Sequence, residues 1–151
     1  MILGITITTR PEEIYRALIE ASAFSTKMII DEAEAYGSRI KKLCISGGIA
    51  LKDEMMMQIF ADVLGRDMLI SSAKQSGAYG SAVRATVSAK LCRDIFEASG
   101  RFEKPIAKTY TPIAENTALY QKLYEEYKAL HDYFGKGGNE VMKRLKKISK
   151  G

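Results

Sequence analysis

The stretch from Lys41 to Ser71 constrains the fold more than any other part of this chain. It predicts a strand, a glycine turn, a helix and a second strand, at residues 41–46, 47–48, 53–64 and 68–70. In the helix, apolar residues recur at three- and four-residue spacing, and Gly65 provides a C-terminal stop. The connection is long enough for the second strand to return parallel to the first. The sequence therefore predicts an α/β unit with a short parallel sheet flanked by helices.

The pair Gly47-Gly48 follows the carboxyl end of a predicted strand, where parallel sheets form their ligand crevices. Without Cβ atoms, these residues allow positive φ and let a ligand lie against bare backbone. An ordinary βα turn and a ligand-binding turn both stay open as interpretations. Asp53, the predicted N-cap, and Glu54 occupy the first turn of the helix and would repel an anion. A nucleotide would therefore place its uncharged adenosine end at this turn.

The length of 151 residues and the 46% hydrophobic content fit one globular domain. The sequence has no apolar run near the roughly 20 residues of a membrane span and no leader pattern, so we expect a cytoplasmic protein. Cys44, in a predicted core strand, and Cys92, in a predicted helix, have no metal-ligand spacing. We interpret both as reduced structural thiols, and no metal site is predicted.

The net charge of +5 is modest, and much of it lies near the C-terminus. A nucleic-acid surface would need aromatic residues among the basic ones, and this tail has none. Cations also stabilise the end of a helix, so a solvated helix end is favoured and no nucleic-acid partner is expected. The basic residues of this tail are Lys143, Arg144, Lys146, Lys147 and Lys150.

Six further segments have a predicted structure. Residues 2–8 alternate as in a strand, although an extended loop is equally compatible, and a helix of some twenty-five residues follows, with Thr9 and Glu12 as capping box. The remaining predictions are a helix at 77–98, an extended connector at 101–114, a helix from 115 to 135 and a short helix after the N-cap Asn139. The helix at 77–98 is rich in small residues, which suits either a hinge surface or tight packing on the sheet.

The helix at 115–135 carries a stripe of apolar and tyrosine residues, which we interpret as core with hydroxyl groups at its rim. Two adjacent parallel strands do not make a stable sheet, so another segment must complete it. No catalytic motif, paired carboxylates or metal cluster can be assembled from these residues. The chain therefore looks like the ligand-binding portion of an enzyme, without the reacting groups.

Three stretches resemble the C-terminal part of the FGGY carbohydrate kinases, members of the actin-like ATPase superfamily. Leu43-Cys44-Ile45-Ser46-Gly47-Gly48 is similar to the adenosine motif of that superfamily. The stretch from Met57 to Arg66 resembles the helix that follows this motif, and the stretch from Gln75 to Ala82 resembles the small-residue helix that connects the two lobes.

The C-terminal third resembles the end of bacterial-type ribulokinases within this family, through Leu123-Tyr124-Glu125-Glu126-Tyr127, Leu130-His131-Asp132-Tyr133-Phe134-Gly135 and the stretch from Asn139 to Leu145. The stretch from Pro11 to Glu20 fits the same subfamily. Ala50 and Glu54 stand where these kinases tend to have proline, and Ser76-Gly77 replaces a more apolar pair.

The resemblance implies a partial ribonuclease H-like lobe with a C-terminal helical extension, in a kinase that transfers the γ-phosphoryl group of ATP, with Mg²⁺, to L-ribulose. Residues 1–100 would be the latter part of the nucleotide-binding lobe, and residues 101–151 a connector and the helical extension. Gly47, Gly48, Ile49 and Asp53 would bind the nucleotide. The catalytic residues, the Mg²⁺ ligands and most of the sugar site would lie upstream, so the resemblance implies no catalytic residue in this chain and no activity of the chain alone.

A second hypothesis is a non-catalytic interaction module derived from such a kinase. It would bind a partner or form a homo-oligomer through an open sheet edge and the tyrosine-bearing helix. Its partners would then be proteins, whereas the kinase hypothesis requires ATP or ADP and the remainder of a kinase.

Overall fold

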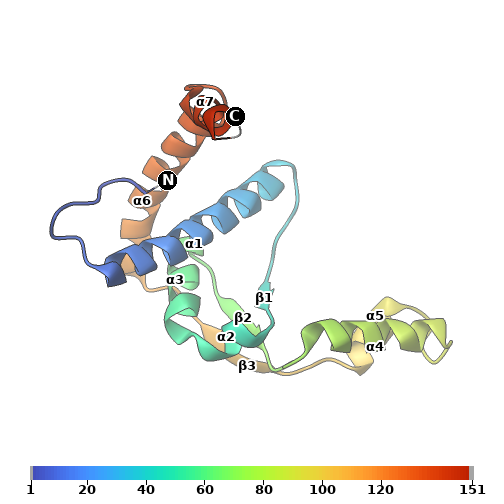
Figure 1. Ribbon diagram of the computed structural model, residues 1–151. Coiled ribbons are helices and arrows are strands. Elements are labelled where there is room, and N and C mark those ends of the chain that lie inside the picture. Colours follow the sequence, from blue (N-terminus) through green and yellow to red (C-terminus); the bar gives the residue numbers. More distant parts are fainter. Residues whose placement is uncertain (1, 150–151) are drawn as a thin grey trace.

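The computed structural model describes residues 2–149. The chain forms seven helices and three strands within this range (Figure 1). In chain order these are α1 (Pro11–Ala35), β1 (Leu43–Ile45), α2 (Gly48–Lys52), α3 (Glu54–Leu64), β2 (Met68–Ser71), α4 (Ser76–Ser88), α5 (Ile95–Arg101), β3 (Ile106–Tyr110), α6 (Ala114–Gly135) and α7 (Val141–Ile148).

The three strands form one sheet in the order β1-β2-β3. β1 and β2 pair in parallel, with Leu43 opposite Met68, which confirms the predicted central unit. β3 pairs with β2 in the antiparallel direction, with Met68 opposite Tyr110. The prediction of an extended connector at 101–114 missed this strand, because only Tyr110 of β3 is buried and no alternation of apolar and polar residues marks it.

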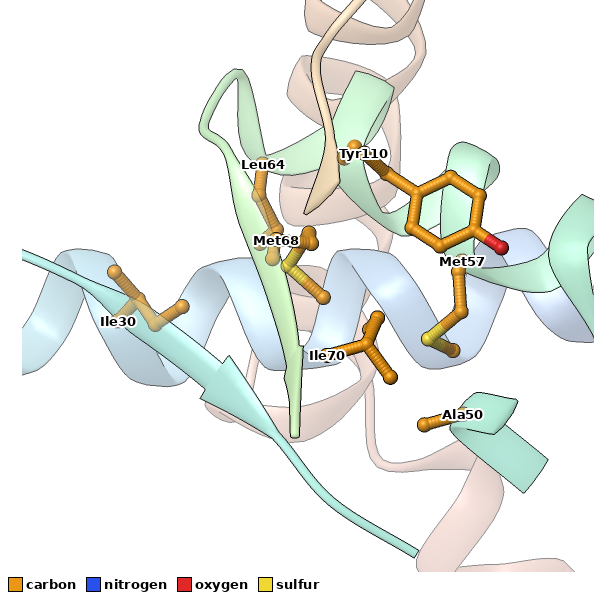
Figure 2. Packing of buried hydrophobic residues seen from close by; sticks show 8 residues of the cluster. Ile30, Ala50, Met57, Leu64, Met68, Ile70 and Tyr110 are labelled. Atoms are coloured by element: carbon orange, nitrogen blue, oxygen red, sulfur yellow. The ribbon is translucent and has the colours of Figure 1, made fainter. Parts of the chain in front are cut away.

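One face of the sheet packs on α1 and α3 and forms the first hydrophobic core. Figure 2 shows Met68 and Ile70 of β2 lying among side chains from α1, α2, α3 and β3. Leu43 and Ile45 of β1 pack against this core, whereas Cys44 alternates to the opposite face and is exposed. The prediction that Cys44 is a core residue is therefore wrong, because the second face of β1 has no cover from the described residues.

A second core joins α1, α3 and α6. It contains Phe24 of α1, Ile59 and Val63 of α3, and two tyrosines of α6, Tyr120 and Tyr124. The tyrosine hydroxyls reach the rim of this core: that of Tyr120 donates to Glu20 at 2.8 Å, and that of Tyr124 to Asp31 at 2.8 Å. The interpretation of the tyrosine helix as core with hydroxyls at the rim is confirmed for these two residues.

Helices α4 and α5 form an arm that projects away from the rest of the molecule (Figure 1). They pack on each other through Val83, Cys92 and Ala98. The predicted single helix at 77–98 is wrong, because the chain turns at Lys90, whose φ is +58°, and Asp94 caps a new helix by accepting hydrogen bonds from the amides of Phe96 and Glu97. Cys92 lies in this turn and is buried there.

Both ends of the described chain depart in detail from the predictions. Residues 2–8 form no strand, and the amide of Arg10 donates to Glu13 Oε2 at 2.7 Å, one residue later than the expected Thr9–Glu12 box. Before α7, Asn139 Oδ1 accepts from the amide of Val141 at 2.9 Å. Lys150 of the predicted basic tail lies outside the described residues. Among helices within residues 2–149, none is both long and apolar enough to cross a membrane.

Candidate functional site

The glycine pair lies where the sequence places it, between the end of β1 and the start of α2. Gly47 has φ +115° and ψ 170°, a backbone conformation that side-chain-bearing residues rarely adopt, so the turn requires glycine there. Gly48 is different, because its φ is ordinary and a Cβ added to it would meet nothing within 4 Å. Packing within this chain therefore does not explain a glycine at position 48.

A shallow hollow of about 290 Å³ opens beside the glycine turn. Gly47, Gly48 and Ile49 form one side of it, and Ile49 is 65% exposed. Met56 and Phe60 of α3, one helical turn apart, line it from another element. Its other lining residues are Ile45, Ser46, Ala50, Met57 and Met68. The hollow approaches the lower end of the volumes typical of small-molecule sites, which are roughly 300 Å³ and above.

Asp53 is not one of the residues around this hollow. Its Oδ1 accepts a hydrogen bond from the amide of Met56 at 2.9 Å, which makes it the N-cap of α3. The prediction that Asp53 is the N-cap of this helix is confirmed. Its predicted contact with a nucleotide stays a prediction, and Asp53 does not line the hollow. Of the four predicted site residues, the structure brings together Gly47, Gly48 and Ile49.

The chemistry of the hollow suits an uncharged, partly apolar group. Each described residue around it is uncharged, and Ser46 contributes its one hydroxyl group. The two acidic residues at the start of α3, Asp53 and Glu54, disfavour an anion nearby. One of these two carboxylates has a cationic partner. Lys108 Nζ pairs with Glu54 Oε1 at 2.8 Å, and this hydrogen-bonded carboxylate raises the pKa of Lys108.

The hollow is lined by backbone and uncharged side chains. Within residues 2–149, no group of three His, Cys, Asp or Glu side chains is arranged to hold a metal ion. The hollow itself contains no side chain that titrates near neutral pH. What this surface can do chemically is accept a flat or apolar portion of a ligand against bare backbone.

Sequence reasoning missed the contribution of Met56 and Phe60 to the site. Both belong to the apolar residues that recur at three- and four-residue spacing in the predicted helix at 53–64, and both also pack against the hydrophobic core. Their four-residue spacing was the available signal, but it is the same signal that indicates a core face. In the structure both side chains are half-buried and line the hollow together with residues of α2, which was not predicted as a helix.

Three comparisons with known proteins agree on the relationship of this chain. The sequence model described as "FGGY family of carbohydrate kinases, C-terminal domain" matches residues 1–89. The ribulokinase of Halalkalibacterium halodurans is 45% identical over 152 aligned positions, which cover 98% of this chain and 27% of that protein. The chain thus spans about a quarter of the length of this relative.

Solved structures of sugar and polyol kinases share the fold. A xylulose kinase from Brucella ovis superposes with a TM-score of 0.74 at 19% identity, over 85% of this chain and 26% of that one. The glycerol kinase of Plasmodium falciparum, solved with ADP, superposes with a TM-score of 0.67 at 23% identity, over 87% of this chain and 26% of that one. The mixed sheet flanked by helices is therefore part of a larger fold in these proteins.

Proposed function

The chain belongs to the FGGY family of carbohydrate kinases, and from this premise we propose that it forms the adenosine-facing part of the nucleotide-binding lobe of an ATP-dependent sugar kinase. Residues 1–100 would be the latter part of that lobe, and residues 101–151 a connector and helical extension of it. Gly47 and Gly48 would lie under the adenosine, with Ile49 beside them. Asp53 would act on the nucleotide only indirectly, by fixing the start of α3.

The observation that carries this proposal is that Gly48 lines a hollow of uncharged residues although packing within the chain does not require a glycine there. Gly48 shares its ordinary φ and open Cβ position with Gly100, but Gly100 is not a residue of this hollow. A ligand that approaches the backbone closely is a reason for glycine. The uncharged lining favours the nucleoside portion over the phosphates, and the acidic residues at the start of α3 favour it further.

The proposed sugar acceptor is L-ribulose, since ribulokinases are the relatives with 44–47% identity to this chain. Phosphoryl transfer depends mainly on positioning and on stabilising the charge of the phosphates. This chain would supply positioning of the nucleoside. The described residues offer no carboxylate cluster for Mg²⁺, so metal binding and the general base are assigned to the remainder of the kinase.

Calorimetric titration with ADP tests the nucleotide site. We expect binding in about the millimolar range, because one shallow hollow supplies only part of a nucleotide site. A Gly48→Leu variant should weaken binding at least about tenfold by filling the wall of the hollow. Gly100→Leu is the matched control, because Gly100 is also exposed and also has nothing within 4 Å of its Cβ position. Absence of ADP heat with the unmodified chain would contradict the proposal.

The chain alone should not phosphorylate L-ribulose, because the groups that hold phosphates and metal are assigned elsewhere. A coupled assay with ATP, Mg²⁺ and L-ribulose measures this directly. Turnover by the purified chain, absent from a mock purification, would show that this assignment of the reacting groups is wrong.

The interaction-module hypothesis is supported by the exposed apolar side chains of this chain, which include Ile2, Leu3, Ile7 and Ile29. It predicts self-association without any heat on addition of ADP. Self-association alone does not distinguish the two hypotheses, because a nucleotide-binding part of a kinase can also self-associate. The ADP titration distinguishes them, because only the kinase hypothesis predicts heat on addition of ADP.

A further inference from the structure

The hollow beside Gly47 and Gly48 offers a ligand more apolar surface than hydrogen-bonding groups. Phe60 lines it with an aromatic side chain, and Met56 lines it with a thioether one helical turn earlier. Both side chains are half-buried and pack against the hydrophobic core, which holds them in place. Nucleic-acid bases have a π-face that can lie on an aromatic side chain, and sulfur also contacts aromatic rings favourably. These two side chains therefore attract a base by its face.

The one hydroxyl group that the described residues contribute to the hollow belongs to Ser46, which is exposed. A serine hydroxyl has one donor and two acceptor lone pairs, and its hydrogen turns to suit the partner. It can accept from the exocyclic amine of adenine, or donate to the carbonyl oxygen that guanine and hypoxanthine carry at the same ring position. A hydroxyl group of this kind does not distinguish one purine from another.

Two carboxylates lie near the hollow in the sequence, and both have partners within the chain. Asp53 Oδ1 accepts from the amide of Met56 at 2.9 Å, and Glu54 Oε1 pairs with Lys108 Nζ at 2.8 Å. Neither acidic residue lines the hollow. A carboxylate at the edge of a base accepts only from N–H donors, and so prefers the bases that carry a donor at that place. The described lining of the hollow provides no such selection.

We propose that this hollow recognises the face of a purine and not its edge, so that the chain binds adenine, guanine and hypoxanthine nucleotides alike. The inference rests on the proposed function, because it concerns the ligand of the same site. A purine has a larger face than a pyrimidine and covers more of the side chains of Met56 and Phe60, so pyrimidine nucleotides bind more weakly. The ligand class is purine nucleotides in general.

A titration of the isotopically labelled chain with AMP, GMP, IMP and CMP, followed by NMR at the backbone amides of Gly47, Gly48 and Ile49, tests this inference. We expect the dissociation constants of the three purine nucleotides to agree within about threefold, and that of CMP to be at least about threefold larger. Ribose 5-phosphate is the control for phosphate binding to basic side chains, and it should leave the amides of Met56 and Phe60 unshifted.

Two substitutions test whether a side chain contacts the edge of the base. Ser46→Ala removes the hydroxyl group, and it should change the dissociation constants of AMP and GMP by the same factor, within about twofold. Asp53→Asn keeps an oxygen that can cap α3 but replaces the carboxylate with an amide. It should leave the ratio of the AMP and GMP constants unchanged.

The possible failures of this inference and of the proposed function are different. AMP binding at the glycine pair that is about tenfold or more tighter than GMP and IMP binding would overturn the inference and leave the nucleotide site standing. A substitution at Ser46 or Asp53 that changes the AMP to GMP ratio about tenfold would do the same. CMP binding as tight as that of the purines would also overturn the inference. Absence of saturable shifts at these amides with all four nucleotides would overturn both the inference and the proposed function.

Discussion

Asn116 of α6 donates a hydrogen bond from Nδ2 to Oδ2 of Asp62, at 2.8 Å, and thereby joins the first turn of α6 to α3. Asp62 is 2% exposed, which is unusual for a carboxylate. Its other oxygen accepts from the amide of Ile113 at 2.8 Å and from Gln58 Nε2 at 2.9 Å. These bonds fix the turn from β3 into α6 against the helix that also lines the candidate site.

Replacing Asp62 with alanine should destabilise the chain strongly. The change leaves the amide of Ile113 and the side chain of Asn116 without their acceptor in a partly buried place, which should lower the free energy of unfolding by about 2–4 kcal/mol. Urea denaturation followed by circular dichroism measures this loss. Asp67→Ala is the control, since Asp67 is an exposed residue at the same end of α3 and should change stability by less than about 0.5 kcal/mol. Equal effects of the two changes would contradict the account of Asp62.

The contact between Tyr124 and Asp31 should contribute measurably to the packing of α6 on α1. Burial, followed by the hydrogen bond to Asp31, raises the pKa of Tyr124, so the phenol stays protonated and continues to donate. Tyr124→Phe should lower the free energy of unfolding by about 1–2 kcal/mol, because the carboxylate loses a partly buried donor. Thermal or urea denaturation of Tyr15→Phe provides the control, as Tyr15 is 56% exposed. A loss in Tyr124→Phe no larger than that in the control would show that this bond adds nothing.

The pair Arg66 and Glu34 should make stability depend on pH in the acid range. Arg66 donates from Nη1 to Oε1 of Glu34 at 2.8 Å and from Nη2 to Oε2 at 2.6 Å, and these bonds lower the pKa of Glu34 from its ordinary value of 4.5. Because the pKa of Glu34 is lower in the folded than in the unfolded chain, its ionised form stabilises the fold at pH values above the ordinary pKa of 4.5. This stabilisation is lost as the pH falls through the folded-state pKa. Glu34→Gln should therefore be less stable than the unmodified chain at pH 7.

The difference between the Glu34→Gln variant and the unmodified chain should shrink as the pH falls below 4.5. Urea denaturation at a series of pH values measures the free energy of unfolding of both chains as a function of pH. Glu32→Gln is the control on the same turn of α1, and its difference from the unmodified chain should not follow this course. A stability difference for Glu34→Gln that is constant from pH 7 to pH 3 would contradict the role given to the ion pair.

The central unit could be predicted from sequence because each of its parts has a local signal. The strand at β1, the glycine turn, the N-cap Asp53 and the stop at Gly65 all depend on residues that are neighbours in the chain. The resemblance to a kinase family, and the fold class it implies, were confirmed for the same reason, since they rest on short stretches of residues.

The parts that were not predicted depend on contacts between distant segments. β3 is a strand because β2 offers it a pairing edge, not because its own residues alternate. Asp62 is buried because residues some fifty positions later bring its donors, and nothing near it in sequence indicates this. Cys44 is exposed because the second face of the sheet has no cover among the described residues, although an apolar strand normally indicates burial on both faces.

The candidate site was predicted in part. The glycine pair has a signal of its own, whereas the walls provided by Met56 and Phe60 depend on where α2 lies. Asp53, which the resemblance places beside the nucleotide, stays a prediction in that role. In the structure its carboxylate caps α3, and it does not line the hollow.

The most direct test of the central claim is a titration of the isotopically labelled chain with adenosine, followed by NMR at each backbone amide. The account predicts that the amides of Gly47, Gly48 and Ile49 shift in a saturable manner, that Met56 and Phe60 respond with them, and that the α4–α5 arm does not. The Gly48→Leu chain should lose these shifts, and the Gly100→Leu chain should keep them. Saturable shifts elsewhere with none at the glycine pair, or no shifts at all, would contradict the claim that this turn receives the nucleoside.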